Sequence, residues 1–315
     1  MPAVGVVVVG AGVAGIACAV ELTAAGVPVR VLDRGRAVGG RMASRRIKGR
    51  PVDLGAAYFT VRDPEFAEVV ARWRTAGLAR PWTSELVVLD GDGRGRSAGP
   101  VRWAAPGGLR TLVSEMASGL DIELDHPVSH VGPGPVVDGE PADVVVLAMP
   151  DPQALRLVDP SSEAAAELAG REWRPVIAVA AGWESRQWPA LPAAFVNDNP
   201  VLSLVADDGD RRGDGAPVLV LHSTAEVARS HDAAPGGAVP AMLDMLRRLL
   251  DVGVEPVWTH TRRWRFASPA GKRDRDFHLG DDGTALAGDG WGVSKVETAW
   301  RSGTMLGREI ARRLG

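Results

Sequence analysis

The chain has 315 residues, a formal charge of −3 and 24% charged residues. This length exceeds the roughly 100–200 residues of a common domain, so two domains are expected. The small net charge argues against a nucleic-acid partner or an anionic membrane surface. A single cysteine excludes an internal disulfide framework, which makes a cytoplasmic location the default expectation. The six histidines show no metal-ligand spacing, so no metal is predicted.

A glycine-rich turn follows an apolar strand at the start of the chain. Val6–Val9 predict a buried strand, and glycines break the apolar stretch where a signal peptide would be continuous. Gly10 permits a tight turn, Gly12 lets a pyrophosphate approach the main chain, and Gly15 lets helix and strand pack closely. The turn therefore predicts a dinucleotide phosphate site at the amino end of a helix.

The helix after this turn leads to a second strand that ends in an acid. Apolar residues at helical spacing in Val13–Ala24 give this helix a buried face, and Gly26 ends it. Val29–Leu32 resume as a strand, and Asp33 lies where the motif places a carboxylate on a ribose hydroxyl. A carboxylate there disfavours a 2′-phosphate, so FAD and NAD both remain open. Cys18 is expected to be a small buried apolar residue and not a redox group.

Seven basic residues lie between Arg34 and Arg50, and the next acid is Asp53. Such a run is usually a solvated loop. Gly39-Gly40-Arg41 favours a different interpretation, because paired glycines allow close backbone approach and arginine binds phosphate through two parallel hydrogen bonds. Arg41 is therefore predicted to contact phosphate.

The middle of the chain departs from strand–helix alternation. An Asp63 cap followed by proline predicts a helix over Glu65–Ala76, and two strands flank a turn at Asp90–Gly93. A short helix is predicted over Leu109–Ala117. The continuous apolar run Val144–Met149 predicts a buried parallel strand of the nucleotide sheet.

The segment from Trp173 to about Ala267 is rich in strands. It contains one clear helix, between Ala238 and Leu250, which favours an antiparallel sheet over a second βαβ unit. Its charged stretch "DDGDRRGDG", residues 207–215, is expected to be an exposed hairpin loop.

A second acidic glycine turn lies near the carboxyl end. Thr284–Ala287 predict a strand, Gly288-Asp289-Gly290 its turn, and an apolar stripe predicts a helix that begins near Ser294. Asp289 can accept a hydrogen bond from a ribityl hydroxyl, and the helix amino terminus can stabilise negative charge on the flavin carbonyl beside N1. Since NAD has no ribityl chain, the two ends of the chain together predict FAD.

The chain resembles the amine-oxidase-like flavoproteins in two further elements. R-x-x-G-G-R spans Arg36–Arg41, and D-x-G spans Asp53–Gly55. Within that group it is similar to renalase-like proteins. The stretches that carry this resemblance are "WAAPGGLRTL" at Trp103–Leu112, "VLAMP" at Val146–Pro150, "LHSTAEVARSH" at Leu221–His231 and "RRWRFASP" at Arg262–Pro269.

The resemblance implies an α/β fold with a Rossmann-like FAD domain of the glutathione-reductase type. A substrate domain of antiparallel sheet plus helices would be inserted into it twice. The expected FAD domain comprises 1–62, 103–172 and 270–315, and the substrate domain 63–102 and 173–269. The implied cofactor is non-covalent FAD, with expected contacts at Gly10, Gly12, Ala14, Gly15, Asp33, Arg34, Gly39, Gly40, Arg41, Met42, Ala56, Ala57, Tyr58, Gly288, Asp289, Val296 and Glu297.

The implied reaction is the oxidation of isomeric dihydronicotinamide dinucleotides, 2- or 6-dihydro-NAD(P), to NAD(P)+. Dioxygen would reoxidise the flavin to give hydrogen peroxide. A dihydropyridine donor needs no dedicated acid or base, because the protein has only to position two rings. The expected pocket walls are Tyr58, Phe59, Trp264 and Trp291, and the expected polar orienting groups are His222 and Arg265.

Three other functions remain open from the sequence. An amine oxidase or desaturase of a small secondary metabolite would use the same flavin scaffold, with Lys272 or Lys295 as candidates for a lysine near flavin N5. A non-catalytic FAD-binding module and a plain NAD dehydrogenase are the other two. The expected partners are a small-molecule substrate and dioxygen, and no nucleic acid or membrane.

Overall fold

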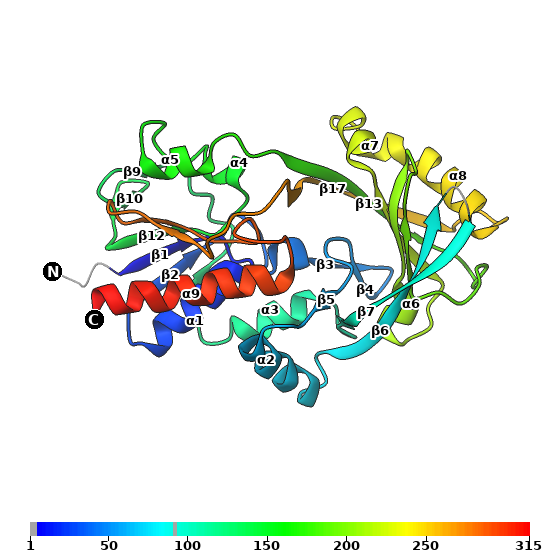
Figure 1. Cartoon of the computed structure of the whole chain (residues 1–315), viewed down its shortest axis with the longest axis horizontal. Coiled ribbons are helices and arrows are strands. Elements are labelled where there is room, and N and C mark those ends of the chain that lie inside the picture. The colour runs from blue at the N-terminus through cyan, green and yellow to red at the C-terminus, as the bar shows by residue number, and fades with distance from the viewer. Residues whose placement is uncertain (1–4, 91–92) are drawn as a thin grey trace. The chain divides into compact units, whose positions relative to one another are not determined.

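The computed structural model describes residues 5–90 and 93–315, and these form two compact units (Figure 1). The first unit comprises the chain up to Met42, Leu112–Trp173 and Ser268–Gly315, and the second comprises Ala43–Thr111 and Arg174–Ala267. Segments 43–62 and 103–111, which the sequence placed in the dinucleotide domain, lie in the second unit. The predicted fold class, a Rossmann-like unit combined with a second unit of sheet and helices, is confirmed.

The first unit is built on a six-stranded sheet in the order β18-β19-β12-β1-β2-β8. All neighbouring strands are parallel except β18 and β19. Continuous valine runs form the central strands, as expected for a parallel sheet that is buried on both faces. The strands are β1 (Val6–Val9), β2 (Val29–Leu32), β8 (Ile122–Glu123), β12 (Val144–Leu147), β18 (His278–Leu279) and β19 (Thr284–Leu286).

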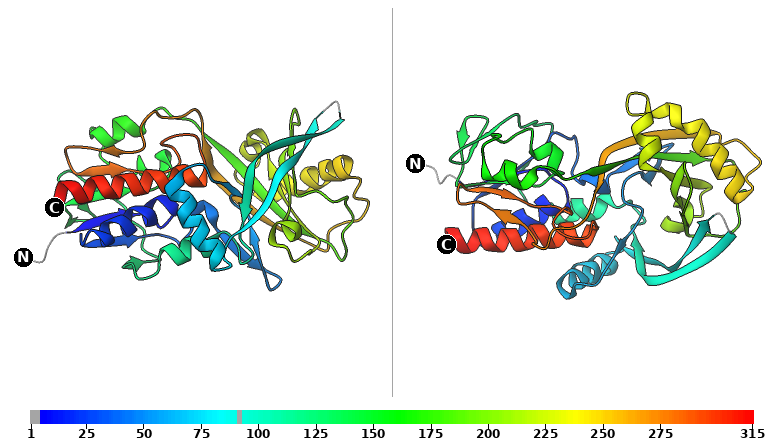
Figure 2. Two further views of the ribbon diagram at one scale, coloured as in Figure 1. Left: turned by 60° about the horizontal axis from the view of Figure 1, so that its bottom comes forward. Right: turned by 45° about the horizontal axis from the view of Figure 1, so that its top comes forward.

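Two long helices of this unit pack against each other, although they come from opposite ends of the chain. Helices α1 (Val13–Ala24) and α9 (Val296–Leu314) run side by side in Figures 1 and 2. Their close approach depends on Gly303, because a Cβ there would lie 1.9 Å from the carbonyl oxygen of Ala14. Cys18 on α1 is fully buried, as predicted, and burial raises the pKa of its thiol to about 12.

Shorter elements complete the first unit. A three-stranded sheet has the order β11-β10-β9. These elements are η1 (Gly40–Met42), α3 (Arg110–Met116), β9 (Val131–Gly132), β10 (Val136–Val137), β11 (Glu140–Pro141), α4 (Asp151–Ala154) and α5 (Glu163–Leu168), with α3 crossing the boundary between the units.

The second unit contains an eight-stranded sheet in the order β17-β13-β16-β15-β14-β6-β7-β5. The antiparallel pairing predicted for it is found between most neighbours, whereas β14 and β6 are parallel. Segments 43–62 and 103–111 belong to this unit partly because β5 pairs with β7. The strands are β5 (Phe59–Thr60), β6 (Arg80–Asp90), β7 (Gly93–Ala104), β13 (Trp173–Gly182), β14 (Ala193–Val196), β15 (Leu202–Asp207), β16 (Val218–Ser223) and β17 (Trp258–Pro269).

The remaining elements of the second unit include the predicted helices. Asp63 caps the helix that begins at Pro64, and Gly77 follows it with φ +71°. Part of the turn predicted at Asp90–Gly93 lies outside the described residues. The elements are β3 (Ser44–Ile47), β4 (Arg50–Asp53), α2 (Pro64–Thr75), α6 (Asp208–Arg212), α7 (Ala225–Ser230), η2 (Pro235–Ala238) and α8 (Val239–Leu250).

The two faces of the eight-stranded sheet differ in the side chains that pack against them. Helix α8 packs its apolar stripe on one face, against residues such as Val179 and Leu221 (Figure 2). The opposite face carries Ala178, Ala180 and Val220, and we call it the Ala178 face. Val52 and Leu54 belong to the same cluster, and Trp258 and Trp264 pack against it.

The segment expected to be an exposed hairpin loop is instead a buried helix. Residues 208–212 form α6, and the side chains of Asp208 and Arg211 are 0% exposed. Asp207 caps the helix by accepting a hydrogen bond of 2.8 Å from the Asp210 amide. The prediction was wrong because the charges of this segment are neutralised by partners from distant parts of the chain.

Within residues 5–90 and 93–315, no helix combines the length and the apolar character needed to cross a membrane.

Candidate functional site

The predicted phosphate turn has the backbone that its glycines require. Gly10 has φ +116°, and a Cβ at Gly15 would lie 1.9 Å from the Gly10 carbonyl oxygen. Gly12, which caps α1, has φ −82°, and a Cβ added there would meet no atom of the described residues within 4 Å. The turn is therefore closed on the side of the sheet and open at Gly12, where an anion could reach the amino end of α1.

The R-x-x-G-G-R element packs directly on this turn. The Gly39 amide donates a hydrogen bond of 2.8 Å to the Ala11 carbonyl, and a Cβ on Gly40 would lie 3.3 Å from the Gly12 Cα. Both glycines have positive φ. The basic stretch is thus held against the open side of the phosphate turn, which agrees with a phosphate-binding role for it.

Asp33 lies at the end of β2 and is fixed by two backbone amides. Its Oδ2 accepts a hydrogen bond of 2.6 Å from the Ala11 amide, and its Oδ1 accepts one of 2.6 Å from the Gly35 amide. A carboxylate offers about four lone-pair sites, so acceptor capacity remains for ribose hydroxyls. Arg34, the next predicted contact, is exposed.

Arg41 and Asp289, the predicted anchors from the two ends of the chain, bind each other. Arg41 donates hydrogen bonds of 2.9 and 2.5 Å to the two oxygens of Asp289, across a separation of 248 residues. Ser294 donates a further bond of 2.5 Å to Asp289, whose side chain is 9% exposed. Three of about four acceptor sites are therefore used, which leaves room for one ribityl hydroxyl. Arg41 also neutralises the carboxylate, which would otherwise repel a pyrophosphate.

The turn that carries Asp289 is held by groups that the sequence did not single out. Arg171 donates to the Gly290 carbonyl and, at 2.9 Å, to each of the Ala270 and Gly271 carbonyls. Ser302 on α9 accepts a hydrogen bond of 3.0 Å from the Gly288 amide. Arg171 lies 119 residues from Gly290 along the chain, and no local motif marks it.

Most of the other residues predicted to contact the cofactor are buried. Met42 is buried, and Ala14 is buried in the first turn of α1. Val296 and Glu297 form the start of α9, where Glu297 is buried. Ala57 is buried in the second unit.

The predicted pocket residues of the second unit do not all face the same way. Trp264 on β17 donates a hydrogen bond of 2.6 Å to the Leu54 carbonyl and packs on the Ala178 face. Its neighbour Arg265 is exposed and pairs with Asp232 at 3.2 Å, because successive strand residues point to opposite sides.

The two predicted aromatic walls at the start of β5 also differ. Phe59 is 2% exposed, and its ring packs edge-on against Phe66 and Trp73, so it fills the interior. Tyr58 is half-buried and lies 6.4 Å from the Trp82 ring.

Trp291 belongs to the core of the first unit. Its ring stacks on His278, and the Arg273 guanidinium lies 4.3 Å above it.

His222 is a half-buried histidine on the Ala178 face, directly opposite Ala178 in the β13–β16 register. Burial lowers the pKa of its imidazole to about 4, and the charge of Arg211 adds to this effect. Its Nε2 has no hydrogen-bond partner among the described residues. At neutral pH the ring is therefore uncharged, and its buried Nε2 is left unsatisfied by the described residues.

The arrangement defines a two-unit protein with a Rossmann-like dinucleotide site. Residues 8–73 match the NAD(P)-binding Rossmann-like domain, and residues 76–310 match the family described as flavin containing amine oxidoreductase. The second match covers most of the chain, and the protein belongs to this family. It is an FAD-dependent oxidoreductase, and its cofactor is FAD.

Similar proteins carry several activities in their names. A 57-residue stretch is 46% identical to hydroxyneurosporene desaturase from Rubrivivax gelatinosus, which is 18% of this chain and 11% of the desaturase. Cyclohexylamine oxidase from Brevibacterium oxydans IH-35A shares the fold over 99% of this chain and 100% of its own, with a TM-score of 0.78 and 16% identity. Putrescine oxidase bound to putrescine shares it over 98% of both chains, with a TM-score of 0.72 and 17% identity.

A matched pair of glycine variants tests the phosphate turn. Gly12→Ala is expected to leave the melting temperature of the apoprotein nearly unchanged, because the new methyl meets no atom of the described residues within 4 Å. It should weaken FAD binding about tenfold or more, about 1.4 kcal/mol, since the methyl occupies the approach to the main chain. Gly15→Ala should lower both stability and FAD binding. Fluorescence quenching gives the FAD affinity and circular dichroism the stability, and wild-type FAD affinity in Gly12→Ala would contradict this role for the turn.

Proposed function

We propose that this oxidoreductase removes a hydride from 2- or 6-dihydro isomers of NAD(P) and releases NAD(P)+. In this proposal the first unit binds FAD and the second unit provides the substrate contacts. When bound, FAD supplies a two-electron hydride acceptor that dioxygen reoxidises with formation of hydrogen peroxide. The protein's own task is to hold the donor ring in position and to keep water out.

The observation that carries this proposal is the charge around the candidate aromatic walls. The Arg102 guanidinium lies 5.6 Å from the Tyr58 ring centre, and the Arg262 guanidinium lies 4.9 Å from the Trp264 ring centre. Aromatic rings that recognise a cationic amine usually present their faces to it. Here each ring already contacts an arginine, so a protonated amine would be repelled and a phosphate-bearing dinucleotide attracted.

The uncharged state of His222 also supports a dihydronicotinamide substrate. An uncharged imidazole whose Nε2 has no partner among the described residues could exchange a hydrogen bond with a neutral carboxamide, and it adds no charge to the apolar Ala178 face. The residues of this face therefore suit a nicotinamide ring better than an alkylammonium group.

A second candidate is an amine oxidase or desaturase of a small metabolite. The family match and the names of the similar proteins favour it. The lysines considered for this chemistry lie at unremarkable places. Lys272 is 66% exposed beside Asp274, and Lys295 precedes the first residue of α9.

Anaerobic titration of the purified holoprotein separates the two candidates. We expect the visible absorbance of the oxidised flavin to be lost on addition of 2- or 6-dihydro-NAD(P). Cyclohexylamine and putrescine, tested at the same concentrations, should leave it unchanged. Rapid reduction by an amine, with no response to either dihydropyridine, would replace the first proposal with the second. Admission of air after reduction should yield one equivalent of hydrogen peroxide per substrate oxidised.

A further inference from the structure

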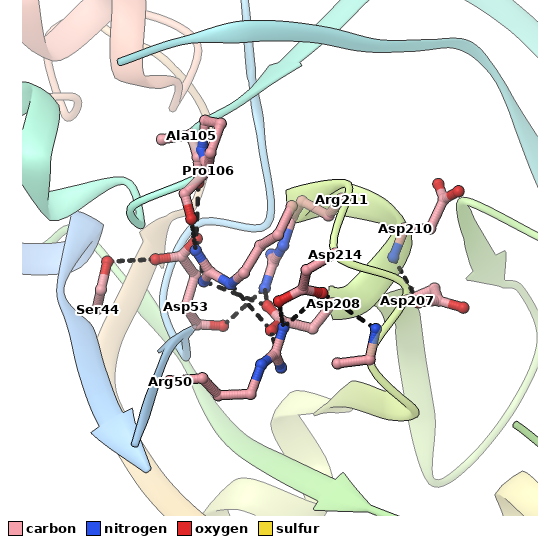
Figure 3. Close-up of polar contacts among 12 residues, drawn as sticks. Ser44, Arg50, Asp53, Ala105, Pro106, Asp207, Asp208, Asp210, Arg211 and Asp214 are labelled. Carbon is pink, nitrogen blue, oxygen red and sulfur yellow. Dashed lines mark hydrogen bonds and ion pairs between the residues drawn. The ribbon is translucent and has the colours of Figure 1, made fainter. Parts of the chain in front are cut away.

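The buried helix α6 stands at the centre of an ion network in the second unit (Figure 3). Asp208 accepts hydrogen bonds from Arg211, from Arg212 at 3.0 Å and from Arg50 at 2.7 Å. Burial alone would raise the pKa of Asp208, but the three guanidinium groups outweigh it and lower that pKa. Asp208 is therefore charged at neutral pH and holds the arginines in place.

The network is balanced in charge. Arg212 pairs with Asp53 at 2.9 Å, and Arg50 pairs with Asp214 at 2.8 Å, so three arginines face three aspartates. Buried ion pairs of this kind contribute little net stability, because desolvation offsets their attraction. Stability alone does not account for the arrangement.

The arginines of α6 also bind backbone carbonyls of two distant segments. Arg211 donates a hydrogen bond of 2.8 Å to the Ala57 carbonyl and one of 3.2 Å to the Asp53 carbonyl. Arg212 donates bonds of 3.2 and 3.3 Å to the carbonyls of Ala105 and Pro106. Arg211 thus spans both ends of the short stretch that contains the predicted flavin contacts Ala56 and Ala57.

We propose that Arg211 is a positioning residue that fixes the backbone of Asp53–Ala57, the stretch that contains the predicted flavin contacts Ala56 and Ala57. This inference rests on the proposed function, since it concerns flavin contacts. Asp208, fixed by three arginines, sets the orientation of Arg211, and the fork of the guanidinium holds the two carbonyls.

Two substitutions test this role in the holoprotein. Arg211→Met removes both the charge and the donors, whereas Arg211→Lys keeps the charge but not the planar fork. Both variants should change the visible circular dichroism of the bound flavin, because the backbone near Ala57 is released. Far-ultraviolet circular dichroism measures whether each variant is folded.

Arg80→Met is the matched control. Arg80 donates hydrogen bonds of 3.1 and 3.4 Å to the Asp210 and Arg211 carbonyls of α6, but it binds neither carbonyl of the Asp53–Ala57 segment. It should therefore leave the flavin dichroism as in the wild type.

The inference is overturned if either Arg211→Met or Arg211→Lys folds and keeps the wild-type flavin dichroism. If Arg211→Met does not fold, the visible circular dichroism of the flavin in Arg211→Lys tests the inference by itself. None of these readouts uses a substrate. If they change as expected while no dihydropyridine reduces the flavin, the proposed substrate is wrong and the role of Arg211 stands.

Discussion

Replacing Asp289 with alanine is expected to yield protein that is nearly free of FAD. The substitution removes the predicted ribityl acceptor, and it leaves the Arg41 guanidinium without the carboxylate that it binds through two hydrogen bonds. The pair is partly buried, with the Arg41 side chain 29% exposed, so the substitution leaves a guanidinium at the cofactor site without its carboxylate. We expect FAD affinity to fall at least about 100-fold, which corresponds to about 2.7 kcal/mol. The ratio of flavin to protein absorbance after gel filtration measures the loss.

Asp276→Ala is the control for this prediction. Asp276 forms an ion pair of 2.9 Å with Arg301, and both side chains are substantially exposed. Removing an exposed pair changes stability by less than about 1 kcal/mol. The control should retain FAD. Full FAD occupancy in Asp289→Ala would show that the turn from Gly288 to Gly290 does not hold the cofactor.

Gly303→Ala is expected to destabilise the first unit strongly. In an exposed helix this change usually stabilises by about 0.5–1 kcal/mol, because alanine has the higher helix propensity. At Gly303 the new Cβ would lie 1.9 Å from the Ala14 carbonyl oxygen and force α9 away from α1. Overpacking of this kind costs typically about 1–3 kcal/mol, and more where backbone must move. Thermal unfolding followed by far-ultraviolet circular dichroism measures the effect.

The test is decisive because close packing of α1 and α9 predicts that Gly303→Ala lowers the stability, whereas helix propensity alone predicts that it raises it. An unchanged or higher melting temperature in Gly303→Ala would mean that α1 and α9 do not pack as closely as described. Met305→Ala, on the exposed side of the same helix, should have a small effect, since Met305 is 38% exposed. Because α1 begins at the phosphate turn, Gly303→Ala should also weaken FAD binding.

Several features of this protein could be predicted from its sequence because their causes are local. The glycine turn after Val6–Val9 follows from residue spacing, as does the Asp63 cap of α2. The turn at Asp289 and the helix after it follow in the same way. These motifs also predicted FAD, because a phosphate turn and a second acidic turn at opposite ends of the chain suit one long cofactor.

The direct contact between Arg41 and Asp289 was not predicted, although each residue was. Each side chain was assigned to the cofactor by its own motif. Only the fold brings β2 and β19 into one sheet, with β1 and β12 between them, and so places the segments that follow them near each other. The parallel arrangement of strands decides this proximity, since their carboxyl ends meet at one edge.

Helix α6 shows most clearly what tertiary structure decides. Its sequence of alternating aspartate, glycine and arginine has the composition of a solvated loop, and local reasoning favours exposure for it. It is buried because Arg50 and Asp53, which complete its charge balance, reach it from about 158 residues away. Burial of charge depends on partners, and sequence spacing does not reveal partners that only folding brings together. The sequence by itself therefore determined the cofactor turns, whereas the tertiary structure decided which charges are buried and which backbone they hold.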